Sequence, residues 1–147
     1  MNILKILKPE SKEVIINNKQ WIFPYRVWNL IELEKVIIVH FLSKEFREHC
    51  PKEIYIGCNI WCYNKNDKSV KWIIEEPPIA INDDGIIWNR TGAAIPSDWP
   101  KTDRDECYLD ISYSKYDDTL DADTTGARRF RVDPDTGKVT LIATGIY

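Results

Sequence analysis

Two histidines and four cysteines are the side chains best suited to metal binding or nucleophilic catalysis. His40 lies in the apolar segment 36–42, where alternation places it on the same strand face as Ile38, so we expect a packed histidine rather than a base. Cys58 and Cys62 are four residues apart, which along a strand is about 13 Å and too far for one tetrahedral zinc ion. The spacing therefore predicts no zinc site and gives no recognisable Cys–His catalytic pair.

Residues 121–126 match the opening of a calcium-binding loop. Asp121, Asp123 and Thr125 supply oxygen at positions one, three and five, and Gly126 stands at position six. The twelfth position, which requires a bidentate glutamate, is Val132. Half a motif of this kind predicts a chain turn rather than a calcium site.

Paired carboxylates recur at places where acids are normally solvated. Glu75 and Glu76 precede two prolines, and Asp83 and Asp84 precede a glycine, so we expect turn residues rather than buried catalytic acids. The chain has no glycine-rich phosphate loop and no Gly-x-Ser-x-Gly nucleophile elbow. The sequence therefore predicts a protein that is not an enzyme and that carries neither a cofactor nor a metal.

The elements that must position these side chains are mostly strands, because period-2 alternation recurs and helical periodicity does not. The expected strands are 3–7, 13–16, 20–25, 29–33, 36–42, 54–63, 70–75, 85–89, 107–114, 128–132 and 138–144. Only residues 43–50 read as a helix, with Ser43 as N-cap and Pro51 ending it.

Hairpins of similar layout are the most informative feature of the pattern. Residues 59–74 and 129–142 each read as an alternating strand, a polar turn and a second strand opened by Lys-Val or Val-Lys, and residues 25–41 form a third unit of that length. A propeller blade takes about 40 to 45 residues, so a full ring does not fit a chain of 147 residues. The sequence predicts one mainly β domain over residues 1–147, either a partial propeller or a sandwich, with Trp61, Trp72 and Trp88 in the core.

Composition indicates the cellular compartment and excludes one class of binding partner. The cysteines Cys50, Cys58, Cys62 and Cys107 are irregularly spaced in a chain long enough to fold without disulfides, so we expect free thiols in a reducing cytoplasm. Lysines interrupt the first nine residues, which predicts neither a signal peptide nor a membrane anchor. The net charge of −3 and the acidic second half exclude nucleic acid as the expected partner, because phosphate binding needs a basic stripe.

Acidic and aromatic residues gather in the second half of the chain, and Trp or Tyr anchors surrounded by charge are typical of protein interfaces. The sequence therefore predicts a partner-binding surface. Its expected members are Glu75, Glu76, Asp83, Asp84, Trp99, Tyr113, Tyr116, Asp117, Asp118, Asp121 and Asp123.

Three motifs carry a resemblance to a known class of bacterial proteins. They are VWNLIELEKVIIV at 27–39, NIWCYNK at 59–65 with VKWI at 70–73, and RFRVDPDTGKV at 129–139. This order of hairpins resembles immunity proteins of polymorphic-toxin and contact-dependent growth inhibition systems. One difference is NKNDKS at 64–69, where such hairpins often carry Asp-x-x-Gly.

The resemblance implies a cytoplasmic inhibitor that binds a cognate protein toxin and occludes its active site. Many such toxins are nucleases with basic clefts, which an acidic surface would neutralise while it speeds association. Two other interpretations stay open. Exposed aromatic side chains would also suit a small-ligand or carbohydrate-binding β domain, and a metal-dependent enzyme would need His40 or His49 to converge with cysteines or acids.

Overall fold

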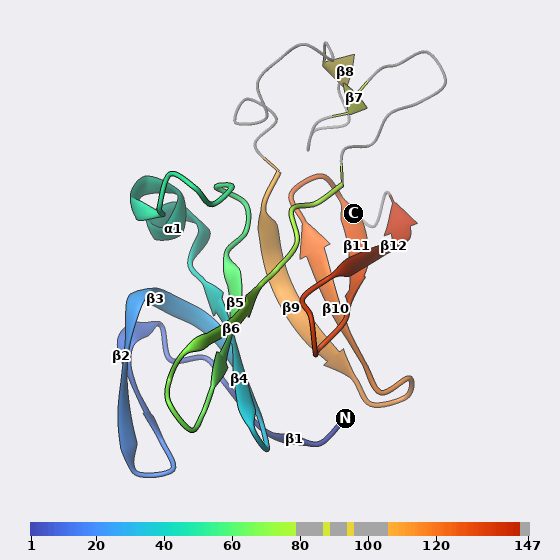
Figure 1. The fold of residues 1–147 in the computed structure, drawn as a ribbon. Coiled ribbons are helices and arrows are strands. Elements are labelled where there is room, and N and C mark those ends of the chain that lie inside the picture. The colour runs from blue at the N-terminus through green and yellow to red at the C-terminus, as the bar shows by residue number, and fades with distance from the viewer. Residues whose placement is uncertain (79–86, 89–93, 96–105, 145–147) are drawn as a thin grey trace.

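The structure is a computed structural model that describes residues 1–78 and 106–144, and the backbone alone of residues 87–88 and 94–95. Two antiparallel sheets pack face to face (Figure 1). The first sheet consists of β1 (Ile3–Leu7), β2 (Ser11–Ile16), β3 (Lys19–Leu33), β4 (Val36–Phe41), β5 (Ile60–Asn64) and β6 (Val70–Ile73). The second consists of β9 (Tyr108–Ser114), β10 (Thr119–Thr124), β11 (Arg128–Val132) and β12 (Val139–Thr144). Other described elements are α1 (Ser43–His49), β7 (Ile87–Trp88) and β8 (Ala94–Ile95). Of the two β arrangements that the sequence left open, the sandwich is the one observed.

Strand β3 is 15 residues long, and its two halves pair with different neighbours. Its first part pairs with β2 and its last part with β1, whereas β4, β5 and β6 extend the sheet from the other edge. The sequence-based division of this segment into strands 20–25 and 29–33 was wrong. Pro24 fits inside the strand because the register against β2 jumps between Ile22 and Val27, so no regular ladder bond is required of it.

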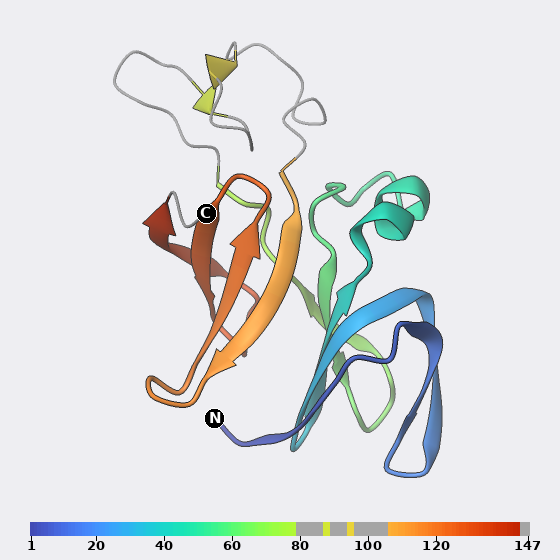
Figure 2. The same cartoon turned by 180° about the vertical axis from the view of Figure 1, so that it is seen from behind.

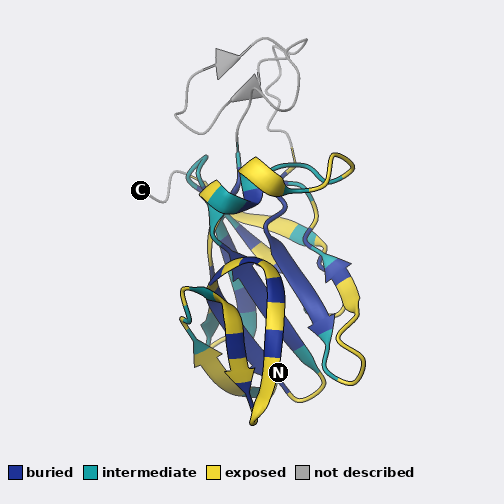
Figure 3. Ribbon diagram, turned by 90° about the vertical axis from the view of Figure 1, so that its left-hand side faces the viewer, coloured by how far each residue is buried: buried dark blue, intermediate teal, exposed yellow. Residues whose placement is uncertain are grey.

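The first sheet is buried on both faces. Ile31, Cys62 and Trp72 lie on the face that packs against the second sheet. The opposite face forms a separate core with the β2–β3 hairpin and α1, and the alternation of buried and exposed positions along that hairpin is visible in Figure 3. Trp61 and Trp72 are both buried, as predicted, but they lie in different cores.

Aromatic side chains dominate the core on the outer face of the first sheet. Their ring centroids lie 5.1–6.4 Å apart, and most pairs meet edge to face, a geometry that adds about 0.5–1.5 kcal/mol per pair beyond burial. The rings belong to Trp21, Phe23, Tyr25, Phe41, Phe46, Trp61 and Tyr63. The β2–β3 hairpin is therefore held over β4 and β5 by ring packing.

Helix α1 begins differently from the sequence-based expectation. Its N-cap is Leu42 rather than Ser43, and no side chain caps it. The Ser43 hydroxyl lies 3.4 Å from the Tyr108 carbonyl oxygen, to which it donates, and it accepts a hydrogen bond of 3.3 Å from Asn59. Ser43 thus contacts the second sheet instead of the first turn of the helix.

The second sheet is a meander in the order β12-β11-β10-β9. The hairpin predicted around the Asp-Pro-Asp-Thr-Gly sequence is confirmed as β11 and β12. Strand β10 was missed, because its segment was interpreted as an acidic loop. Its alternation is clear in the structure: Leu120, Ala122 and Thr124 are buried, and Asp121 and Asp123 face outward. The expected strand 54–63 was also wrong in its first part, since β5 begins at Ile60.

The end of β6 is fastened to the β11–β12 turn. The Trp72 indole nitrogen donates to the Pro134 carbonyl at 2.9 Å, and the backbone N–H of Glu75 donates to the Gly137 carbonyl at 3.0 Å. Gly137 has φ +74°, and a Cβ atom there would lie 2.5 Å from Cε3 of Trp72. This position therefore requires glycine both for its backbone conformation and for its contact with the indole ring.

Candidate functional site

The turn between β9 and β10 carries several of the predicted partner-binding residues. Tyr116 is fully exposed. The turn that presents it is braced, because the Tyr113 hydroxyl donates a 2.6 Å hydrogen bond to Oδ1 of Asp118 and the amino terminus of Met1 pairs with the same carboxylate. Figure 2 shows the N-terminus close to this turn. The amino terminus first, and Tyr113 second, hold the pKa of Asp118 below its ordinary value.

Asp121 and Asp123 are engaged on the outer face of the second sheet. Asp123 forms a bidentate pair with Arg129, with contacts of 2.7 and 3.1 Å. Asp121 pairs with Arg131 at 3.2 Å. The two pairs lie across the β10–β11 ladder, so these carboxylates are directed to arginines rather than to a calcium loop. Asp117 is the acid of this cluster that has no ion pair within the described residues.

Glu75 and Glu76 do not lie on the β9–β10 turn. The Glu75 carboxylate accepts the backbone N–H of Val139 at 3.1 Å, and its carbonyl accepts the Tyr108 hydroxyl at 2.8 Å. Glu75 thus fastens β6 to the second sheet. Glu76 is half-buried beside Tyr55; burial raises the pKa of Tyr55 to about 12, and Glu76 adds to that shift. Asp83, Asp84 and Trp99, together with the side chain of Trp88, lie outside the described residues.

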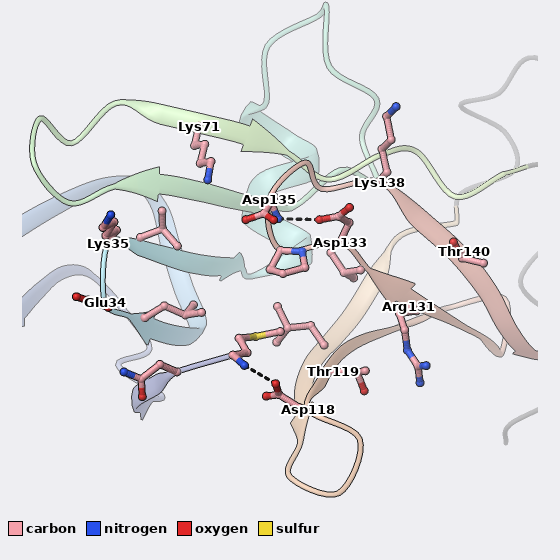
Figure 4. A pocket seen from close by; sticks show the side chains of 17 residues that line it. Glu34, Lys35, Lys71, Asp118, Thr119, Arg131, Asp133, Asp135, Lys138 and Thr140 are labelled. Carbon is pink, nitrogen blue, oxygen red and sulfur yellow. Dashed lines mark hydrogen bonds and ion pairs between the residues drawn. The ribbon is translucent and has the colours of Figure 1, made fainter.

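A cleft of about 750 Å³ opens between the two sheets next to the β9–β10 turn. Figure 4 shows the side chains that line it. They come from the N-terminus, from strands β3, β4, β6, β10, β11 and β12, and from the turns β3–β4, β9–β10 and β11–β12. Its apolar side chains continue the core between the sheets. They are Met1, Leu33, Val36, Leu120, Val132 and Pro134. An apolar surface with a few polar groups around it is the usual composition of a ligand site.

The charged side chains of the cleft are of both signs. Lys35, Lys71 and Lys138 are cations without an ion pair in the part of the chain that the structure describes, and Glu34, Asp133 and Asp135 are the corresponding acids. None of these six residues is among the site residues predicted from the sequence. Each occurs in a strand or turn where a solvated charge is ordinary, and only the face-to-face packing of the sheets brings them together.

A buried polar cluster lies at the other side of the sandwich. The Tyr108 carbonyl oxygen accepts a hydrogen bond of 2.9 Å from Nδ2 of Asn59. The same oxygen lies 3.0 Å from Nε2 of His40. Asn29 donates a 2.6 Å hydrogen bond to Asp110. Three buried atoms of this cluster have no hydrogen-bond partner among the described residues: Oδ1 of Asn29, Nδ1 of His40 and Oδ1 of Asn59. The cluster fastens the sheets together and encloses the His40 ring.

Comparisons with known protein families, curated proteins and solved structures find no match to this chain. Within the described residues, no helix is long and apolar enough to cross a membrane, and no three metal-ligating side chains converge. The prediction of no zinc site assumed that Cys58 and Cys62 lie on one strand. Cys58 precedes β5, so the distance expected along a strand does not apply to this pair. Burial raises the pKa of the Cys62 thiol to about 12.

Proposed function

We propose that this chain is a protein-binding inhibitor, an immunity protein that neutralises a cognate bacterial toxin, and that the β9–β10 turn contacts the toxin. The observation that carries the proposal is Tyr116, a fully exposed aromatic side chain on a braced turn. Tyrosine supplies a large contact area with few rotatable bonds, and a turn that is already ordered loses little entropy on binding.

The aspartates near Tyr116 differ in how far each is free to attract a partner. Asp118, Asp121 and Asp123 already have cationic partners within the chain. Asp117 therefore contributes more than these three to the attraction of a basic partner. A nuclease is the toxin class that fits such a contact, because its phosphate-binding cleft carries Lys and Arg side chains.

The test uses the candidate toxin domain encoded by the neighbouring reading frame. The parent protein should bind that domain with one-to-one stoichiometry and protect cells that express it. Tyr116→Ala should weaken binding about 30-fold, which corresponds to about 2 kcal/mol for an interface anchor. Ile22→Ala is the matched control, because Ile22 is 72% exposed but lies on the β2–β3 hairpin.

Equal binding by the parent and Tyr116→Ala would remove the β9–β10 turn from the interface. A neighbouring reading frame that encodes an ordinary metabolic enzyme, whose expression is harmless without this chain, would remove the immunity function itself.

A further inference from the structure

The cleft between the sheets has a partly exposed apolar lining, which consists of Met1, Val36 and Pro134. Leu33, Leu120 and Val132 belong to the core between the sheets and also line the cleft. Val36 and Met1 pack against the same core and line the cleft as well. The apolar part of the lining is aliphatic, because none of the described residues that line the cleft is aromatic. Stacking of a sugar ring is therefore not the chemistry of this site.

Two opposite charges stand at the opening of the cleft. Lys71 on β6 points toward the β11–β12 turn, and that turn carries Asp135 (Figure 4). Both side chains are exposed, and they form no ion pair with each other. Both residues line the same cleft.

The other charges of the cleft are directed elsewhere or already engaged. Figure 4 shows the Glu34 carboxylate and the Lys138 ammonium pointing away from the cleft. Arg131 pairs with Asp121, and Asp133 accepts the backbone N–H of Asp135 at 2.8 Å. The ammonium groups that remain for a bound molecule are therefore those of Lys35 and Lys71, and the remaining carboxylate is that of Asp135.

We propose that the cleft between the sheets binds a small zwitterion with an aliphatic side chain, that is, a free amino acid or a short peptide. The ligand carboxylate contacts Lys71, its ammonium contacts Asp135, and its side chain lies on the aliphatic surface formed by Met1, Val36 and Pro134. Hydrogen bonds between charged groups are stronger than neutral ones, and they fix the orientation of a ligand whose apolar part alone would not. This inference does not depend on the proposed toxin binding, because it concerns a different set of residues.

The experiment is a titration of the ¹⁵N-labelled full chain, followed by amide shifts, with four probes. L-leucine and L-leucyl-leucyl-leucine distinguish a single amino acid from a peptide. N-acetyl-leucine lacks the ammonium, and leucinamide lacks the carboxylate. We expect saturable shifts at the residues that line the cleft with leucine or with the tripeptide, and binding of either one-charge probe that is weaker by about five- to tenfold.

Charge-removing variants then assign each contact. Lys71→Met should weaken leucine about five- to tenfold and leave leucinamide unchanged, whereas Asp135→Asn should weaken leucine and leave N-acetyl-leucine unchanged. Lys52→Met is the matched control, because Lys52 is exposed and does not line this cleft. Both test positions are exposed, and the amide spectrum of each free variant reports whether it is folded.

Absence of saturable shifts with both leucine and the tripeptide would overturn the proposal. Equal affinity for leucine, N-acetyl-leucine and leucinamide would overturn the zwitterion assignment, and so would identical losses in Lys52→Met and Lys71→Met. None of these outcomes bears on the toxin-binding test, which involves Tyr116.

Discussion

His40 of the first sheet lies with its Nε2 atom 3.0 Å from the carbonyl oxygen of Tyr108 in the second sheet. The same carbonyl accepts Nδ2 of Asn59, so one backbone oxygen joins three segments of the chain. Only 2% of His40 is exposed, and its Nδ1 atom has no hydrogen-bond partner in the part of the chain that the structure describes. The ring is therefore suited to the neutral form, in which Nε2–H donates to the carbonyl and Nδ1 carries no proton.

Stability should depend on pH through His40. Burial lowers its pKa, and this effect outweighs the opposing effects of the Tyr108 carbonyl and of Asp110. In the unfolded chain the pKa returns to about 6.5, so below that pH the unfolded state binds a proton that the folded state does not. Stability is then lost as the pH falls, by at most about 1.4 kcal/mol per pH unit for this one group.

Urea unfolding of the parent and of His40→Asn between pH 7.5 and pH 5 measures this contribution. The variant should be less stable at pH 7.5 but lose less stability on acidification. His49→Gln serves as the control, since the His49 side chain is exposed, and it should keep the parental pH profile. If His40→Asn lost as much stability on acidification as the parent, the pH dependence could not be attributed to His40.

The Glu32 carboxylate is a second buried charge with defined partners. Its side chain is 3% exposed and accepts hydrogen bonds from Lys65 at 2.6 Å and from Asn17 at 2.7 Å. Burial would raise the pKa of Glu32, but the hydrogen bonds and the positive charges of Lys65 and Lys5 together outweigh burial and hold the pKa below its ordinary value. Lys65→Met should therefore reduce the free energy of unfolding by about 2–4 kcal/mol, because it leaves a buried carboxylate without its cation.

Chemical denaturation measures that loss, and two further variants interpret it. Glu32→Leu combined with Lys65→Met should recover part of the stability, since no unpaired charge is then buried. Lys12→Met removes the more exposed Lys12–Glu45 pair and should change stability by less than about 1 kcal/mol. Similar losses for Lys65→Met and Lys12→Met would show that burial of Glu32 does not matter.

Gly137 should tolerate no side chain. Gly137→Ala meets both the left-handed backbone and the Trp72 ring, and we expect a loss of about 2–3 kcal/mol by thermal or urea unfolding. Asparagine adopts left-handed backbone more readily than alanine, yet it has the same Cβ atom. Gly137→Asn should therefore remain destabilised, and recovery of parental stability in this variant would show that the contact with Trp72 is not limiting.

Charge reversal along the acidic segment should have unequal effects on folding. The sequence alone predicts that reversing Asp117, Asp118, Asp121 and Asp123 leaves folding nearly intact. In the structure, lysines at positions 121 and 123 would stand directly across the ladder from Arg131 and Arg129. Asp121→Lys with Asp123→Lys should therefore lower the melting temperature by several degrees, whereas Asp117→Lys should not. Equal melting temperatures for the double variant and for Asp117→Lys would show that the cross-strand pairs do not contribute to stability.

Alternation predicted strands such as β11, in which buried residues alternate with more exposed ones. The confirmed β11–β12 hairpin shows how strongly a Pro-Asp-Thr-Gly turn specifies its neighbours. Alternation did not lead to the prediction of strand β10, because Asp121 and Asp123 suggest a solvated loop. Only the structure shows that both carboxylates pair with arginines. The cleft was missed for a related reason. Lys71 and Asp135 are 64 positions apart in the sequence, and nothing local to either residue indicates that they face one opening.

The two sheets are also consecutive along the chain, because the strands of the first come from residues 3–73 and those of the second from residues 108–144. During synthesis the first sheet can therefore form around its own aromatic core while the second is still incomplete. At about 5–20 residues per second, the 70 residues from 75 to 144 take roughly 4–14 s to emerge. Throughout that interval the surface around Ile31, Ile38 and Ile60 lacks its cover. The order of the strands thus makes the nascent chain, rather than the finished protein, the form in which this molecule is most prone to aggregate.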